Sequence, residues 1–278
     1  METMDGVWAS WVAASEAWEQ SLITAGRSDG TRRLRMHHLG RFAAAHPDGF
    51  DVPSESITAW LSGFADNEYR RSLRSTLSTF YRWAHGTGRL PANPMDAVPT
   101  VARKLPSPRP APNEVYRAAL VGADERLRLL LALARGLGMR RHEVARAHSD
   151  DLEQDLDGWT LRVLGKGNKV RRIPLPDGLA ATLRAWIREN GEGWLFRGQV
   201  DGHISAQWVG KLVSTAMPGR WTMHTLRHRF ATDAYEVERD LMTLMELCGW
   251  ASLETARHYV AVPSQRARAM VQAVSAAA

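Results

Sequence analysis

The chain has 278 residues, of which 44% are hydrophobic, so it is comfortably long for two domains with real cores. Its single cysteine, Cys248, excludes a disulfide framework, no apolar run reaches membrane-spanning length and the N-terminus has no signal pattern, so we expect a cytoplasmic protein with no membrane partner. The formal net charge of +6 favours a polyanionic partner, although charge alone does not separate nucleic acid from an anionic membrane surface.

Helical patterns fill the first part of the chain. Apolar residues recur at near-helical spacing through the first 22 positions, which favours an amphipathic core helix. A second helix is expected over residues 31–45, with Leu34 and Phe42 facing inward. Its basic residues, together with His37 and His38, are expected to face out. A turn-rich break and a short helix follow.

A longer helix is predicted over residues 67–84, because its apolar residues form one stripe. The stripe consists of Leu73, Leu77, Phe80, Tyr81 and Ala84. Three arginines, Arg70, Arg71 and Arg74, lie largely on other faces of this helix. A solvated face and a phosphate-contacting face explain them about equally well from the pattern alone.

A proline-rich basic segment, residues 99–112, separates two regions of regular patterning. Its five prolines exclude a regular helix or a central strand, and Arg103 and Lys104 make it basic. We therefore expect a helical domain at residues 1–98, an extended linker, and a second domain at residues 113–278.

The second domain combines helices with one β-hairpin. A strongly apolar helix is predicted around residues 126–138. Residues 159–175 contain two alternating apolar runs around a glycine turn, with Lys166 at the tip. The expected fold is mainly α, with a small antiparallel β-hairpin or sheet, in two domains.

Six polar residues of the second domain have the chemistry needed for a phosphate ester. They stand near glycine turns or predicted helix starts, and they are Arg140, Lys166, His224, Arg227, Trp250 and Tyr259. Arginine forks fit phosphate oxygens, lysine can give up a proton, and histidine can act as acid, base or donor. An indole N–H only donates, and a phenol can be an oxygen nucleophile although it ordinarily titrates near pH ~10. The set suits attack of a phenol on a phosphodiester inside a cage of donors.

Each of these residues also has an ordinary structural explanation. Arg140 and Glu143 can pair at i, i+3 on a helix surface. Lys166 can be a solvated turn residue, and Trp250 and Tyr259 can belong to a core. Their joint occurrence in this order favours the catalytic interpretation. The sequence shows no Cys/His ligand spacing, acidic triad or complete nucleotide loop, so we expect neither a metal nor a cofactor.

Four motifs make the chain resemble the tyrosine site-specific recombinases, the phage-integrase family. In chain order they are Gly138-Met139-Arg140-Arg141-His142-Glu143, Gly165-Lys166-Gly167, His224-Thr225-Leu226-Arg227-His228, and Leu247-Cys248-Gly249-Trp250 with Tyr259 nine residues on. The resemblance covers the chain from about residue 113, and all of its motifs are filled in order. Trp250 stands where histidine is commoner in the family, a variant that still offers a ring N–H.

The resemblance implies a covalent mechanism. Tyr259 would attack the scissile phosphate and form a 3′-phosphotyrosyl link, freeing a 5′-hydroxyl. Lys166 would protonate the leaving oxygen, and His224 would handle the proton of the tyrosine. Because the covalent link conserves the bond energy, strand exchange would need no ATP.

The resemblance also assigns the residues that surround the phosphate. Arg140 and Arg227 would clamp the non-bridging oxygens, and Trp250 would support the phosphate. Glu143 would hold the region of Arg140 in place.

In such a protein the first domain would be a helical core-binding domain. The residues expected to contact DNA are Arg70, Arg71 and Arg74 on the long helix and Arg103 and Lys104 in the linker. The expected partners are double-stranded DNA attachment or core sites, further copies of the chain in a tetramer on DNA, and an accessory factor that sets direction or bends DNA. The terminal alanines also resemble a degradation tag read by a host protease.

The length argues against a separate arm-binding domain, so we expect a small phage integrase acting near the nucleoid of a bacterial host. Related uses of the same chemistry are a chromosome-dimer recombinase, a topoisomerase-like nicking-closing enzyme and a hairpin-forming resolvase. A DNA-binding protein that has lost catalysis on this fold is the alternative from another class, and the complete set of six residues argues against it.

Overall fold

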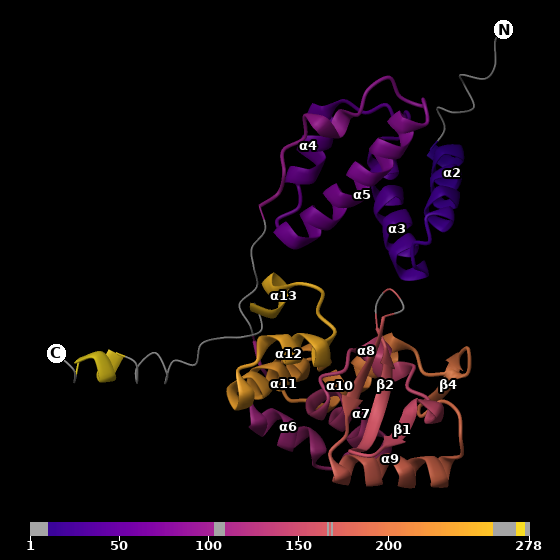
Figure 1. Cartoon of the computed structure of the whole chain (residues 1–278). Coiled ribbons are helices and arrows are strands. Elements are labelled where there is room, and N and C mark those ends of the chain that lie inside the picture. Colours follow the sequence, from indigo (N-terminus) through magenta and orange to yellow (C-terminus); the bar gives the residue numbers. More distant parts are fainter. Residues whose placement is uncertain (1–10, 103–108, 166, 168, 258–270, 276–278) are drawn as a thin grey trace. The chain divides into compact units, whose positions relative to one another are not determined.

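The structure, a computed structural model, describes residues 11–102, 109–165, 167, 169–257 and 271–275. It divides the chain into two compact units, residues 1–105 and 106–278, and the division falls inside the proline-rich segment (Figure 1). Among the described helices, none is both long enough and apolar enough to cross a membrane.

The first unit is helical in its described part. Its elements are α2 (Trp11–Thr24), α3 (Asp29–Ala45), α4 (Ser54–Ser62), α5 (Asn67–Gly86) and the 3-10 turn η1 (Pro94–Asp96). Asp66 caps the N-terminus of α5, because its side chain accepts a hydrogen bond from the backbone N–H of Tyr69 at 2.8 Å. All five residues of its predicted apolar stripe are buried, and they pack against Trp18 of α2 and Phe42 of α3. The predicted stripe is therefore confirmed, and α5 is the central helix of this core.

The rotation of α3 differs from the sequence prediction. Leu34 is 48% exposed, whereas Leu39 and Phe42 are fully buried. His38 shares their face and is buried, with its Nδ1 3.0 Å from the hydroxyl of Thr76 on α5. The prediction that His38 faces out was wrong, because Leu39 and Phe42, three positions apart, determine which side of the helix meets the core.

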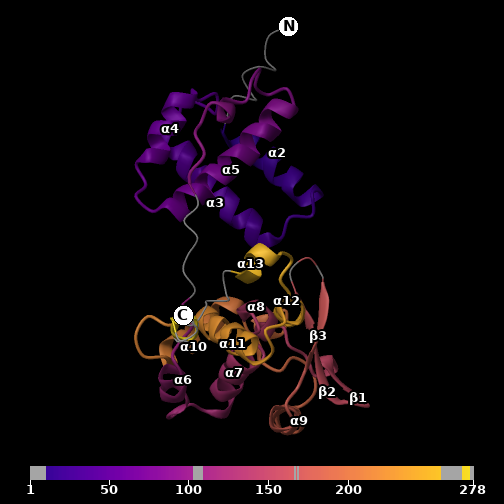
Figure 2. The same ribbon diagram turned by 60° about the vertical axis from the view of Figure 1, so that its left-hand side comes forward.

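The second unit contains the remaining elements. They are α6 (Asn113–Leu120), α7 (Glu125–Gly136), α8 (Arg141–Ala145), η2 (Ser149–Asp151), β1 (Leu152–Asp155), β2 (Gly158–Leu164), β3 (Val170–Pro174), α9 (Asp177–Asn190), β4 (Arg197–Val200), α10 (Ala206–Ala216), α11 (Met223–Glu238), α12 (Leu241–Cys248) and α13 (Leu253–Arg257). The sheet is antiparallel in the order β1-β2-β3, and Figure 2 shows α9 beside it. The predicted hairpin corresponds to β2 and β3, and β1 is an additional strand.

Buried and exposed residues alternate along the hairpin, so one of its faces meets the core. Leu161 and Val163 on β2 are buried, and Val163 pairs with Arg171 of β3 in the register of the ladder. At the turn, the backbone N–H of Gly165 donates to the carbonyl of Lys169 at 2.8 Å.

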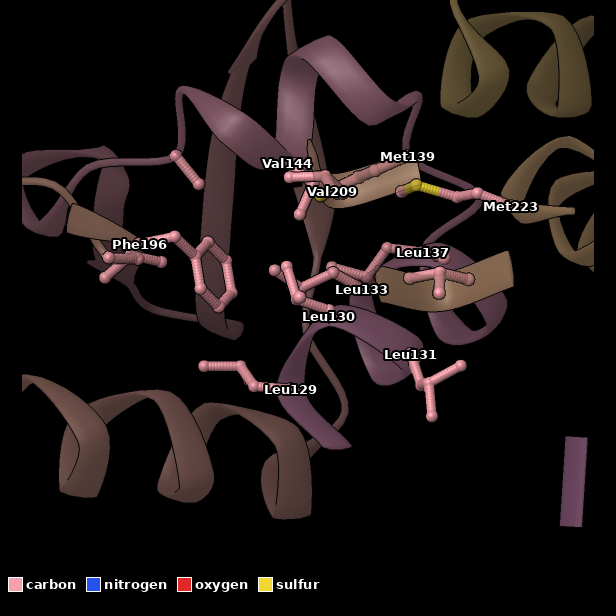
Figure 3. Packing of buried hydrophobic residues seen from close by; sticks show 14 of the residues in the cluster. Leu129, Leu130, Leu131, Leu133, Leu137, Met139, Val144, Phe196, Val209 and Met223 are labelled. Atoms are coloured by element: carbon pink, nitrogen blue, oxygen red, sulfur yellow. The ribbon is translucent and has the colours of Figure 1, made fainter. Parts of the chain in front are cut away.

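Helix α7 runs through the middle of the second core. Leu130 and Leu133 have no exposed surface, and Figure 3 shows them between Phe196 and Leu137. Burying a leucine of this size contributes roughly 1.5–3 kcal/mol relative to leaving it exposed. This core holds α7 and the following residues, which lead directly into the candidate site.

Candidate active site

Arg140 reaches the site through a tight turn that follows α7. Gly138 has φ +60°, and a Cβ added there would lie 2.3 Å from a ring carbon of Phe230, so only glycine fits. The turn places Arg140 at the start of α8, where its backbone N–H donates to Oε2 of Glu143 at 2.7 Å. Its Nη1 donates to Oε1 of the same carboxylate at 2.8 Å.

Glu143 is shared between two arginines. Its side chain has no exposed surface, and Arg171 on β3 donates to both carboxylate oxygens at 2.9 and 2.7 Å. Burial alone would raise the pKa of Glu143, but the hydrogen bonds from Arg171 and Arg140 outweigh it and lower the pKa to about 2. The carboxylate is therefore ionised at neutral pH, and it carries four charge-assisted or backbone donors.

Arg227 lies on α11 and is almost wholly buried, with 1% of its surface exposed. Its Nη1 donates to the carbonyl of Gly138 and its Nη2 to the carbonyl of Cys248. Burial, followed by the charge of Arg140, lowers the pKa of Arg227 to about 10, so it stays a cation at neutral pH.

Three successive carbonyls at the end of α12 each accept from a different arginine. The pairs are Leu247 with Arg171 Nε at 2.9 Å, Cys248 with Arg227 Nη2, and Gly249 with Arg140 Nη2 at 3.0 Å. Gly249 ends the helix in the left-handed conformation, at φ +59°. The negative end of the α12 dipole thus helps to hold three guanidinium groups together.

His224 stands in the first turn of α11, one helical turn before His228. The two imidazole rings have centroids 4.3 Å apart. Partial burial and then the charges of Arg227 and neighbouring arginines lower the pKa of His224. His224 is therefore neutral at physiological pH and able to accept a proton.

A cavity of about 630 Å³ brings Arg140, His224 and Arg227 together. Neither Arg141 nor Lys211 was predicted to be a site residue, yet both line this cavity. Lys211 lies on α10, whose apolar spacing gave no signal of a site. The cavity is lined by cations and fits an anionic group.

The remaining predicted site residues have different surroundings. Trp250 is 8% exposed, packs in a small apolar cluster with Leu244 and Cys248, and has the Arg227 guanidinium carbon 5.7 Å from its ring centroid. Lys166 and Tyr259 lie outside the described residues.

The arginines predicted to contact DNA from α5 are engaged within the first unit. Arg70 donates to the carbonyl of Phe64, and Arg71 pairs with Glu68 at 3.0 Å. Arg74 donates to the carbonyls of Val98 and Pro99, at 2.9 and 2.7 Å, and so holds the start of the proline-rich segment against α5.

A groove on α5 gathers hydroxyl and guanidinium groups. Its cavity measures about 370 Å³, and its lining residues are Arg71, Arg74, Ser75, Ser78, Thr79, Arg82, Thr100 and Val101. Arg82 was not singled out from the sequence. Arg103 and Lys104 lie outside the described residues.

Two arginines and a histidine thus line one cavity of a helical unit with a small sheet, and guanidinium groups in such a cavity suit a phosphate group. The model of the phage integrase family matches residues 113–266. Tyrosine recombinase XerC of Xanthomonas campestris pv. campestris is 31% identical over 259 residues, which cover 85% of this chain and 79% of that protein. Tyrosine recombinase XerC of Corynebacterium efficiens is 29% identical over 268 residues, covering 88% of this chain and 85% of that protein.

Solved structures share the fold. A lambda integrase dimer bound to a COC′ core site matches with a TM-score of 0.72 and 22% identity, covering 90% of this chain and 77% of that chain. The post-cleavage complex of XerH recombinase with palindromic difH DNA matches with a TM-score of 0.69 and 20% identity, covering 86% and 78% of the two chains. The chain belongs to the phage integrase family and is a DNA recombinase of the tyrosine class.

Proposed function

We propose that this recombinase cuts and rejoins specific DNA sites through a 3′-phosphotyrosyl intermediate, and that it integrates and excises a phage or mobile element. The observation that carries the proposal is the convergence of Arg140, Arg227 and neutral His224 on one cavity. Both arginines are held by carbonyls at the end of α12, ten and eleven residues before Tyr259 in the sequence.

The reaction needs two proton transfers and one stabilised charge. The phenol oxygen of Tyr259 forms a bond to the phosphorus while the bond to the 5′-oxygen breaks. His224, whose pKa lies below its ordinary value, takes the phenol proton, and Lys166 gives a proton to the leaving 5′-oxygen. Arg140 and Arg227 stabilise the charge that develops on the non-bridging oxygens, typically the largest contribution to such a rate. Religation runs the same steps in reverse.

DNA is the proposed substrate and partner. The groove on α5 offers Arg82 and a row of hydroxyls to the phosphate backbone, and the linker residues Arg103 and Lys104 would add contacts that weaken with salt. Arg70 and Arg74, which bind carbonyls, would position the groove and the linker in addition to any DNA contact they make.

The proposed assembly is a tetramer on two DNA sites, with an accessory factor that sets direction. A lambda integrase tetramer bound to a Holliday junction has the same fold, with a TM-score of 0.72. Resolution of chromosome dimers is the second candidate, because the curated relatives of this chain include XerC proteins at 31% identity. Sequencing the DNA that becomes covalently trapped separates the two: attachment sites support the first, and a single chromosomal site supports the second.

The test uses a nicked site from which the cleaved strand diffuses away. The unmodified protein should accumulate a covalent protein–DNA adduct, whereas Tyr259→Phe should bind the same DNA and form none. An undiminished adduct in Tyr259→Phe would falsify the assignment of the nucleophile.

A further inference from the structure

Arg171 is a buried cation that lies outside the four motifs quoted from the sequence. It lies on β3, five residues after Lys166 in the sequence, and its side chain is 7% exposed. Its inward direction follows from the alternation of β3, in which Arg171 and Ile173 are buried and their neighbours are exposed. A buried arginine is costly unless each of its donors has a partner.

Every nitrogen of the Arg171 guanidinium has a partner. Nη1 and Nη2 donate to the two oxygens of Glu143, and Nε donates to the carbonyl of Leu247. The two-pronged pairing fixes the plane of the carboxylate, which in turn receives the backbone N–H and Nη1 of Arg140. Arg171 therefore orients Arg140 through one intermediate side chain.

The same guanidinium connects two further parts of the site. A Cβ on Gly165, at the start of the β2–β3 turn, would lie 3.4 Å from Nη1 of Arg171 and 3.7 Å from Oε1 of Glu143. A Cβ on Gly249, at the end of α12, would lie 3.2 Å from Nη1 of Arg171. The base of the lysine hairpin and the segment that leads to the tyrosine thus both meet Arg171.

Arg171 also changes the charge that Arg140 can direct at a phosphate. Arg140 and Arg171 both pair with Glu143, so the cluster of two guanidinium groups and one carboxylate carries a net charge of +1. Without Arg171 the carboxylate would neutralise Arg140 alone and compete with the phosphate for its donors.

We infer that Arg171 is a positioning residue of the recombination reaction, which orients Arg140 through Glu143 and ties it to the hairpin and to the end of α12. This inference rests on the proposed function. It concerns the rate of strand cleavage rather than the affinity for DNA, because Arg171 is buried and does not line the cavity.

The test compares Arg171→Met with Arg172→Met. Arg172 is the next residue of β3, but its side chain is 63% exposed and pairs with Glu153 on the outer face. On a nicked site, Arg171→Met should form the adduct on the order of 100-fold more slowly, the size expected when a reacting group is misplaced by about an ångström. The DNA affinity of Arg171→Met should stay within about threefold of that of the unmodified protein. Arg172→Met should keep both its adduct rate and its DNA affinity within the same range.

A second substrate separates positioning from a general loss of structure. In a methylphosphonate at the scissile position, a methyl group replaces one non-bridging oxygen and removes its charge. On this substrate the rate defects of Arg171→Met and Arg140→Met should both shrink to about tenfold or less. Both substitutions impair Arg140, and Arg140 stabilises the charge that the methyl group removes. If only the defect of Arg140→Met shrinks, Arg171 is structural and the inference is overturned.

Arg171→Lys keeps the charge if Arg171→Met does not fold. An ammonium cannot pair with both carboxylate oxygens and with the Leu247 carbonyl in the same planar geometry, so a slowdown of about tenfold is expected. An adduct rate equal to that of the unmodified protein in either folded variant overturns the inference. Absence of the adduct from the unmodified protein and from Arg172→Met instead contradicts the proposed function.

Discussion

Replacing Glu143 by glutamine should weaken the second unit strongly and in a pH-dependent way. The carboxylate is fully buried, and its pKa is lowered from an ordinary 4.5 to about 2. At about 1.4 kcal/mol per pKa unit, this difference corresponds to about 3 kcal/mol of stability at neutral pH. Because the folded-state pKa is the lower one, the contribution is complete above pH 4.5 and is lost as the pH falls towards 2.

The assay is hydrogen exchange read by mass spectrometry on peptides from α8 and β3, which reports the opening of this unit separately from the helical one. Glu143→Gln should lower the free energy of opening by about 3 kcal/mol at pH 7, and by about half of that or less near pH 3. Glu153→Gln is the matched control, because Glu153 also pairs with two arginines but is 37% exposed, so its loss should stay below about 1 kcal/mol. Equal losses in the two variants, or a loss for Glu143→Gln that does not change with pH, would refute this reasoning.

Three further predictions concern the turn, the DNA groove and the leaving group. Gly138→Ala should destabilise the second unit by about 2 kcal/mol or more in urea unfolding, because Gly138 has a positive φ and the ring of Phe230 packs against it. Gly136 has open space around it, so Gly136→Ala should change stability by about 1 kcal/mol at most. Equal effects of the two substitutions would contradict the close contact at Gly138. Arg82→Ala should weaken DNA binding in fluorescence anisotropy titrations and reduce the slope of log affinity against log salt concentration by about 1. Arg188 is exposed on α9, and Arg188→Ala should leave both the affinity and this slope unchanged. An unchanged slope for Arg82→Ala would remove the groove on α5 from the DNA interface. Lys166→Ala should cleave slowly but recover on a substrate with a 5′-thiolate leaving group, which needs no proton, and failure to recover would count against the general-acid role.

The parts of the fold that follow a strict period were predictable from the sequence. The stripe of α5 repeats over several turns, and residues 161–164 of β2 alternate strictly, so the pattern determines the buried face in both. Strand β1 was missed because its four residues, Leu152 to Asp155, include a single apolar residue and therefore show no apolar–polar alternation. The predicted orientation of α3 was wrong because Leu34 is as apolar as Leu39. Only the packing of α3 against α5 decides that Leu39 is buried and Leu34 is exposed.

The site was predictable where a residue stands in a motif and unpredictable where tertiary contacts decide. His224 and Arg227 share one face of a helix, as their spacing indicates. Arg171 looks like an outward-facing strand residue, and its role emerges only when Glu143 and the carbonyl of Leu247 meet it. The arginines of α5 could likewise not be assigned to DNA or to carbonyls from the sequence.

The most direct test of the account is to find the residue that carries the DNA. The covalent complex formed on a nicked site would be digested with nuclease and protease and analysed by mass spectrometry. The account predicts a peptide in which Tyr259 carries a nucleotide through its 3′-phosphate, and no such peptide from the Tyr259→Phe variant. A nucleotide attached to any other residue, or attached through a 5′-phosphate, would contradict it.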